Sequence, residues 1–284
     1  MIEIGNLSFA YGNSRLFQDL NVDFAPGRIY GLLGKNGAGK TSLYKLICGM
    51  LKPTTGYCSV LNFDSRKKHP AMLKDLFLIP ESYYLPPISI ERYEKLHAPF
   101  YDKFDSDSFQ RYLQEMELEK SHMLTNLSYG LSKRFLLAFG LATKSRILLL
   151  DEPTNGLDIP SKQILRKLLA GSIDDDRLFI IATHQIKEVE NIFDNLVFID
   201  QGRIMLDSSI AAISSQLTIR TARSSESLDH VIYKEEIPGG YTVLESNTNE
   251  NEGTMDLEFL FKAVMDSSED FLSLLPTEAE EKSE

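Results

Sequence analysis

The sequence predicts an α/β fold, in which a mostly parallel β-sheet is flanked by helices and followed by a small C-terminal α/β extension. Apolar, strand-like runs alternate with helical patterns through residue 206, and parallel strands need such crossovers between them. A glycine-rich stretch at residues 34–41 joins one apolar run to the helical pattern after it. Of the 284 residues, 43% are hydrophobic and 25% charged, as in ordinary globular proteins.

The N-terminal elements follow from the spacing of apolar residues. A helix is expected from about Lys40 to Met50, because Leu43, Leu46 and Ile47 recur at helical spacing. Short apolar or alternating runs predict strands at residues 2–9, 20–24, 29–33 and 76–79.

From about residue 83 to 140 the pattern becomes helical, which predicts a helical subdomain inserted between strands. Asp105 or Ser106 is expected to cap one of its helices, because either side chain can accept a hydrogen bond from a helix amide. Farther along, the sequence predicts strands at residues 147–150 and 178–182, a helix from about Pro160, another short helix, and a hairpin at residues 195–206.

The chain divides into a main domain, residues 1–220, and a C-terminal extension, residues 221–284. The extension carries 16 acidic and 4 basic side chains, whereas the main domain carries 25 and 26. An acidic surface repels nucleic acid, so no nucleic-acid partner is expected. Strands are expected at residues 217–222, 230–237 and 241–246, a short helix at residues 257–265, and disorder over roughly the last nine residues.

The sequence predicts a cytoplasmic protein. No apolar run reaches the roughly 18–20 residues that a transmembrane helix requires, since Lys144 and Arg146 interrupt the longest candidate, residues 135–150. The N-terminus has neither the basic start nor the apolar centre of a signal peptide. Cys48 and Cys58 are expected to be reduced and buried, because two cysteines make neither a disulfide framework nor a metal site.

The glycine-rich stretch fits the phosphate-binding pattern G-x-x-x-x-G-K-[ST]. It consists of Gly34, Lys35, Asn36, Gly37, Ala38, Gly39, Lys40 and Thr41. Glycines let the backbone wrap closely enough for its amides to point at phosphates, and the positive end of the following helix adds attraction. Lys40 is expected to contact the β- and γ-phosphates and Thr41 to ligate Mg²⁺, with Ser42 also in the nucleotide site.

Two carboxylates, Asp151 and Glu152, follow the apolar run at residues 147–150. In a parallel sheet, ligands lie at the carboxyl ends of the strands, where the phosphate loop also lies. Asp151 is therefore expected to hold the hydration shell of Mg²⁺, and Glu152 to orient and activate the attacking water as general base. The alternative is a pair of acids in an exposed turn, and the phosphate loop favours the catalytic interpretation.

Four further features lie at characteristic places around these two motifs. Tyr11 precedes the phosphate loop, NLSYGL at residues 126–131 precedes a helix, NGLD occupies residues 155–158, and His184 follows an apolar run. In this order the features resemble an ATP-binding-cassette (ABC) ATPase over residues 1–205. The resemblance implies a P-loop NTPase fold with an antiparallel β subdomain and a helical subdomain beside the parallel core.

The resemblance also implies a role for each of these residues. Tyr11 would stack on adenine, and His184 would contact the γ-phosphate. NLSYGL is similar to the LSGGQ signature of the family, so Ser128 and Gly130 would contact the γ-phosphate bound by a partner subunit. Asp158 would communicate across the dimer. Taken singly, the tyrosine, the histidine and the Ser-Tyr-Gly turn also fit ordinary structural roles.

Two departures from the family pattern are informative. Tyr129 and Leu131 replace the usual glycine and glutamine of the signature, and Glu81 replaces a glutamine that links Mg²⁺ to the membrane partner. Glu81 still offers an oxygen to the metal. These departures, and the tail at residues 256–261, resemble cassette subunits of the ABC-2 type, many of which serve exporters.

The resemblance implies ATP hydrolysis by a homodimer, with Lys40, Glu152 and His184 as the catalytic set and ATP and Mg²⁺ bound. Each ATP would lie between the Lys40 loop of one copy and the Ser128 loop of the other. The implied partner is an integral membrane permease on a separate chain, with this chain peripheral on the cytoplasmic face. Export is the favoured direction of transport.

Two alternatives to a transport role are open, and a third interpretation fits poorly. A soluble ABC-type ATPase acting on translation or DNA repair usually has tandem cassettes or long coiled-coil arms, which this sequence lacks. An ATP-sensing switch without turnover would follow if the divergent signature and Glu81 prevented hydrolysis. A small-molecule P-loop kinase fits poorly, because the pair Asp151 and Glu152 suits attack by water.

Overall fold

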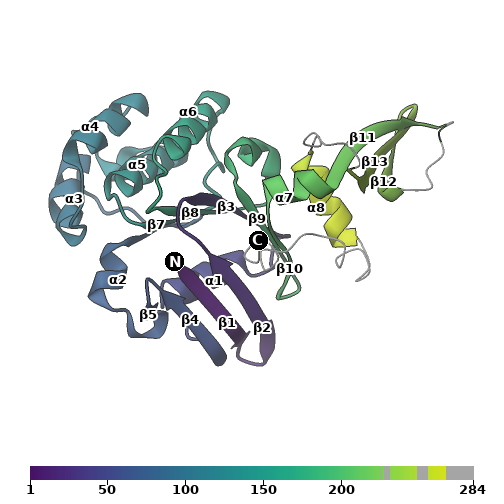
Figure 1. Cartoon of the computed structure of the whole chain (residues 1–284). Coiled ribbons are helices and arrows are strands. Elements are labelled where there is room, and N and C mark those ends of the chain that lie inside the picture. Colours follow the sequence, from purple (N-terminus) through teal and green to yellow (C-terminus); the bar gives the residue numbers. More distant parts are fainter. Residues whose placement is uncertain (225, 227–230, 248–254, 267–284) are drawn as a thin grey trace.

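The central sheet of the protein has six strands in the order β10-β9-β3-β8-β7-β6 (Figure 1). Neighbouring strands are parallel except β9 and β10, which form an antiparallel hairpin. The computed structural model describes residues 1–224, 226, 231–247 and 255–266. The strands are Arg28–Leu33 (β3), Leu76–Ile79 (β6), Ile147–Asp151 (β7), Leu178–Thr183 (β8), Asn195–Asp200 (β9) and Arg203–Ser209 (β10). The predicted parallel core is confirmed.

Both faces of the central sheet are buried, and this explains its apolar strands. In β7, Leu148 and Leu150 belong to one apolar core, whereas Ile147 and Leu149 belong to a second core on the opposite face. A strand covered on both sides needs apolar residues at every position, because successive side chains point in opposite directions. The continuous apolar run before Asp151 is the result.

A four-stranded antiparallel sheet in the order β2-β1-β4-β5 covers one of these faces, with helix α1 packed between the two sheets (Figure 1). The bounds are Ile2–Tyr11 (β1), Ser14–Phe24 (β2), Thr55–Val60 (β4), Phe63–Asp64 (β5) and Lys40–Ile47 (α1). Strand β2 begins earlier than predicted, because Arg15 and Phe17 pair with Ala10 and Phe9 of β1. That pairing depends on the neighbouring strand, and β2 alone does not reveal it.

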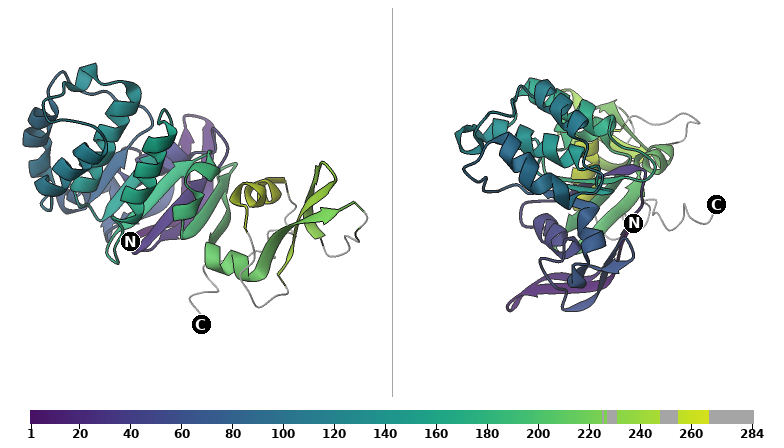
Figure 2. Two further views of the ribbon diagram at one scale, coloured as in Figure 1. Left: turned by 90° about the horizontal axis from the view of Figure 1, so that it is seen from above. Right: turned by 90° about the vertical axis from the view of Figure 1, so that its left-hand side faces the viewer.

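Helices lie on the other side of the sheet, with α5 and α6 against it and α3 and α4 packed farther out on α5, in the region where the sequence predicted a helical subdomain (Figure 2). They are α3 (Ile90–His97), α4 (Ser106–Glu115), α5 (Tyr129–Ala142) and α6 (Ile159–Ala170). Asp105 caps α4, since its Oδ1 accepts a 2.9 Å hydrogen bond from Ser108 N, which confirms one of the two predicted caps. Among the residues that the structure describes, no helix is both long and apolar enough to span a bilayer.

Short helical segments connect the larger elements. The short helix predicted before the hairpin consists of two 3₁₀ turns, η4 (Ile186–Glu188) and η5 (Glu190–Ile192). The others are α2 (Pro70–Lys74), η1 (Ser65–Lys67), η2 (Ala98–Phe100) and η3 (Leu124–Asn126).

The C-terminal region forms a three-stranded antiparallel sheet, and its last described helix returns to the main core. The elements are α7 (Ile210–Gln216), β11 (Leu217–Arg223), β12 (Val231–Ile237), β13 (Gly240–Ser246) and α8 (Leu257–Asp266). The predicted domain boundary at residue 220 falls inside β11. Helix α8 buries Leu260 and Val264 in the core on the helical side of the sheet, and the ring of Phe261 lies 5.3 Å from that of Phe198. The tail predicted to be disordered lies outside the described residues.

Candidate functional site

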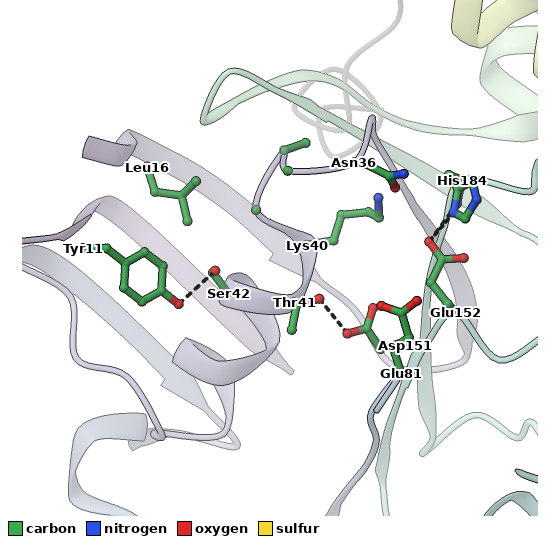
Figure 3. Close-up of a pocket in the computed structure, with 13 residues that line it drawn as sticks. Tyr11, Leu16, Asn36, Lys40, Thr41, Ser42, Glu81, Asp151, Glu152 and His184 are labelled. Carbon is green, nitrogen blue, oxygen red and sulfur yellow. Dashed lines mark hydrogen bonds and ion pairs between the residues drawn. The ribbon is translucent and has the colours of Figure 1, made fainter. Parts of the chain in front are cut away.

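Four neighbouring strands of the central sheet end at one cleft of about 500 Å³ (Figure 3). The phosphate loop follows β3, Glu81 follows β6, the two acids lie at the end of β7, and His184 follows β8, while Tyr11 and Leu16 reach the cleft from β1 and β2. Because the four strands of the central sheet are parallel, their carboxyl ends meet at one edge of the sheet. The residues that line the cleft are Tyr11, Leu16, Asn36, Gly37, Ala38, Gly39, Lys40, Thr41, Ser42, Glu81, Asp151, Glu152 and His184.

Two glycines shape the phosphate loop for different reasons. Gly37 has a φ of 83°, and a Cβ added there would meet only open space, so its backbone direction alone requires glycine. Gly39 has a φ of 109°, and a Cβ there would come within 2.6 Å of the Phe17 ring. Gly39 also precedes the first turn of α1 and has no side chain to cap it. The first amides of α1 are thus available to a phosphate.

The ammonium group of Lys40 is held against the loop that it follows. Its Nζ donates hydrogen bonds to the carbonyl oxygens of Gly34, at 2.7 Å, and Lys35, at 3.4 Å. Burial lowers the pKa of Lys40, and the nearby carboxylates oppose that shift. A cation in this position attracts phosphate oxygens, and the contact of Lys40 with the β- and γ-phosphates stays a prediction.

Thr41 and Asp151 place two oxygen atoms side by side in the cleft, and either atom could bind a metal ion. Thr41 Oγ1 donates a 2.7 Å hydrogen bond to Asp151 Oδ2. Burial raises the pKa of Asp151, while the hydrogen bond from Thr41 acts in the opposite direction. A buried carboxylate with this tendency gains from a nearby cation.

The carboxylate group of Glu152 is held in place by contacts to both of its oxygen atoms. Its Oε2 accepts a 3.0 Å hydrogen bond from Thr183 Oγ1, and its Oε1 accepts one of 3.1 Å from the backbone N–H of His184. The ring Nδ1 of His184 lies 2.7 Å from the same Oε1 atom, within hydrogen-bonding distance. These contacts fix the positions of both carboxylate oxygens of Glu152, which lines the cleft.

Tyr11 forms the wall opposite the acids (Figure 3). Its hydroxyl lies 3.1 Å from Ser42 Oγ, and its ring meets Phe9 edge to face at 4.8 Å. Tyr11 as a residue is 49% exposed, so its ring is accessible to a planar ligand. Leu16 lines the same side, and it was missed because it lies on the part of β2 that was not predicted.

Glu81 also reaches the cleft, and its Oε1 accepts a 3.4 Å hydrogen bond from Asn155 Nδ2. In the described part of the chain, Ser128, Gly130 and Asp158 do not line this cleft. Ser128 caps α5 by accepting a bond from Leu131 N. Their predicted roles at the nucleotide of a second copy remain predictions.

Gly34 and Lys35 contribute the carbonyl oxygens that hold Lys40 and do not themselves line the cleft. Two contacts of Glu152 were missed by sequence reasoning. Thr183, which ends β8, could have been suspected from its place before His184. Lys133 donates a 2.7 Å hydrogen bond to Glu152 O, and no local pattern marks it.

A glycine-rich loop with a buried lysine, beside two consecutive acids at the end of one strand, defines a site for binding and hydrolysing a nucleoside triphosphate. The family described as "ABC transporter" matches residues 17–155. The peptide export ATP-binding protein SkfE of Bacillus subtilis is 31% identical over 222 residues, which cover 76% of this chain and 92% of that protein. The lantibiotic transport ATP-binding protein SrtF of Streptococcus pyogenes is 30% identical over 218 residues, which cover 73% of this chain and 90% of that protein.

The chain belongs to the ABC transporter family, as an ATP-binding protein and ATPase of that family. A solved ATP-binding subunit of an ABC transporter has the same fold, with a TM-score of 0.69 and 22% identity over 75% of this chain and 91% of that one. The predicted family, fold class and enzyme class are therefore confirmed.

Proposed function

We propose that the chain hydrolyses ATP with Mg²⁺ as a homodimer, and that this reaction drives export through a membrane permease on a separate chain. The observation that carries the hydrolytic part is the meeting of Lys40, Asp151 and Glu152 in one cleft with His184 bonded to Glu152. The similarity to SkfE and SrtF, which are described as export and transport proteins, supports the transport part.

The oxygen donors at the floor of the cleft fit Mg²⁺. Thr41 Oγ1 and Asp151 Oδ2 lie 2.7 Å apart, and both are hard oxygen ligands of the kind that Mg²⁺ prefers. Thr41 would ligate the ion directly, Asp151 would hold its water shell, and Glu81 would offer a further oxygen. The ion, when bound, neutralises charge on the β- and γ-phosphates.

Glu152 is suited to act as the base. In the proposed reaction, a proton of the attacking water passes to Glu152 while the water oxygen bonds to the γ-phosphorus. The bond from that phosphorus to the β,γ-bridging oxygen breaks, which yields ADP and phosphate. Lys40 and the amides of α1 hold the phosphate oxygens, and His184 keeps the carboxylate oriented toward the water.

The substitution Glu152→Gln tests the hydrolytic part. Glutamine keeps the shape of the side chain but cannot accept the proton, so phosphate release should fall by about 10²–10⁴-fold while ATP binding persists. Light scattering of this variant should show an ATP-dependent dimer. Near-normal turnover would remove Glu152 from the role of base, and a monomer at every protein concentration would count against the homodimer.

The transport part is tested by purification from native membranes. The tagged chain, extracted with mild detergent, should bring down a multi-span membrane protein in stoichiometric amount, as a peripheral subunit on the cytoplasmic face would. Recovery from the soluble fraction alone would instead favour an ATP-driven switch without a transport partner.

A further inference from the structure

The first turns of α5 contact the loops that carry the catalytic acids. Lys133 is fully buried, and its Nζ donates a 2.7 Å hydrogen bond to the backbone carbonyl of Glu152. Tyr129, one turn earlier, donates from its hydroxyl to the backbone carbonyl of Glu81 at 3.2 Å. One helix of the helical subdomain therefore touches the segments that follow both β6 and β7.

Burying an ammonium group is unfavourable unless its surroundings compensate for the lost water. Burial lowers the pKa of Lys133, and the carboxylates of Glu81, Asp151 and Glu152 oppose this shift. The Lys133 charge thus lies in the negative potential of the catalytic site, although its hydrogen bond goes to a backbone carbonyl.

The backbone that Lys133 holds is in an unusual conformation. Glu152 has a φ of 47°, in the left-handed region that residues other than glycine seldom adopt. Its carbonyl also accepts a 3.3 Å hydrogen bond from Asn155 N. Such a conformation persists only where neighbouring contacts fix it, and Lys133 supplies one of these contacts from outside the loop.

The ammonium group of Lys133 lies over the ring of Tyr129, which is 48% exposed. The centre of this ring lies 5.7 Å from Lys133 Nζ and 6.1 Å from the centre of the Tyr83 ring, which is stacked on it. On another side the ring reaches Gly156, where an added Cβ would come within 2.4 Å. The tyrosine that replaces a glycine of the family signature therefore fills a place between α5 and the loop after Glu152.

We propose that Lys133 is a positioning residue for the general base: by holding the Glu152 carbonyl it fixes the direction of the Glu152 carboxylate, and Tyr129 keeps Lys133 in place. This inference rests on the proposed hydrolytic function. It predicts that loss of the Lys133 hydrogen bond slows the chemical step and leaves ATP binding intact.

The test is steady-state phosphate release by the full chain carrying Lys133→Met, with ATP affinity measured separately using a fluorescent nucleotide. Methionine fills similar space but has no donor, so kcat should fall by about tenfold or more, while KM and the ATP Kd change by less than about twofold. Lys133→Arg keeps a charged donor and should recover part of the lost kcat. The control Lys120→Met removes an ammonium paired with Glu94 elsewhere in the helical region and should leave kcat unchanged.

Wild-type kcat in folded Lys133→Met would overturn the inference, as would a fall in activity explained wholly by loss of folded protein in thermal unfolding. If Lys133→Met does not fold, Tyr129→Leu decides. A fall in kcat of at least a few fold for Tyr129→Leu, with unchanged ATP Kd, supports the inference, and unchanged kcat in this variant overturns it. Unmodified protein that binds ATP without releasing phosphate would refute the proposed hydrolysis and this inference together.

Discussion

The hydroxyl group of Thr41 donates a hydrogen bond of 2.7 Å to Oδ2 of Asp151, and so joins the first turn of α1 to the end of β7. Asp151 is 2% exposed, and its burial raises its pKa above the usual value of 3.8. The folded state therefore favours the protonated carboxyl. The contribution of Asp151 to the free energy of unfolding is therefore most favourable below about pH 3.8, where the carboxyl is protonated in both states. This contribution is lost as the pH rises through the pKa of Asp151 in the folded state.

Asp151→Asn should accordingly stabilise the nucleotide-free protein at neutral pH while it abolishes Mg²⁺-dependent hydrolysis. A gain of about 1 kcal/mol would raise Tm by roughly 2–4 °C. Differential scanning fluorimetry at several pH values should show the gain shrinking as the pH falls. The control Asp102→Asn, an exposed partner of Lys74, should change Tm very little. A lower Tm for Asp151→Asn at neutral pH would contradict the prediction.

His184→Ala should slow hydrolysis because Glu152 Oε1 loses the 2.7 Å bond from the imidazole. The backbone N–H of His184 and the hydroxyl of Thr183 still hold the carboxylate, so the loss is expected to be partial, about 10–100-fold in kcat. Phosphate release at saturating ATP measures it. Thr183→Val, which removes one bond to Oε2, is the matched comparison and should also lower kcat. Unaltered kcat in both variants would show that orientation of the carboxylate does not limit the reaction.

Tyr11→Ala should weaken ATP binding, because it removes the exposed ring that faces the cleft. Stacking of a base on an aromatic ring is worth about 1–3 kcal/mol, so the ATP Kd should rise by about 5- to 150-fold. Tyr11→Phe keeps the ring and loses only the contact with Ser42, so its Kd should stay within about threefold. A Kd for Tyr11→Ala equal to that of the wild type would place the base elsewhere.

Leu260→Ala should destabilise the whole cassette. Leu260 is fully buried in the core that α8 shares with the central sheet, and such a truncation costs about 2–5 kcal/mol. Chemical denaturation should report this loss in a single transition that includes the nucleotide site. Lys262→Ala, which removes only a half-exposed pair with Glu235, should cost about 0.5 kcal/mol or less. A separate early transition would mean that the C-terminal elements unfold independently.

The sequence could predict which residues meet at the cleft because the parts of the cleft are local. The phosphate loop lies between a strand and a helix, and Asp151 and Glu152 follow an apolar strand, so parallel pairing alone brings them together. His184 could be placed by the same reasoning, since it follows β8, the neighbour of both β3 and β7. The lengths of elements were less predictable, and β2 began six residues too late in the prediction because its first half depends on pairing with β1.

Contacts between distant segments could not be predicted in the same way. Lys133 stands between Ser132 and Arg134 as one polar residue among others, and only the packing of α5 directs it to the carbonyl of Glu152. Tyr129 could be recognised as a departure from the family signature, but its contact with Gly156 needs the folded loop. The packing of α8 on the main core could not be predicted either, because an amphipathic pattern indicates that one face of a helix is buried but not which surface buries it.

The place of α8 in the chain has a consequence for biosynthesis. Because synthesis runs from the N-terminus, the phosphate loop, both acids and His184 are made well before Leu257, the first residue of α8. Until that helix emerges, the apolar surface around Phe198 on β9 lacks the cover that Phe261 later provides. A nascent chain can therefore hold every catalytic residue while its hydrophobic surface is still exposed, and in that interval it is a natural client for a ribosome-associated chaperone.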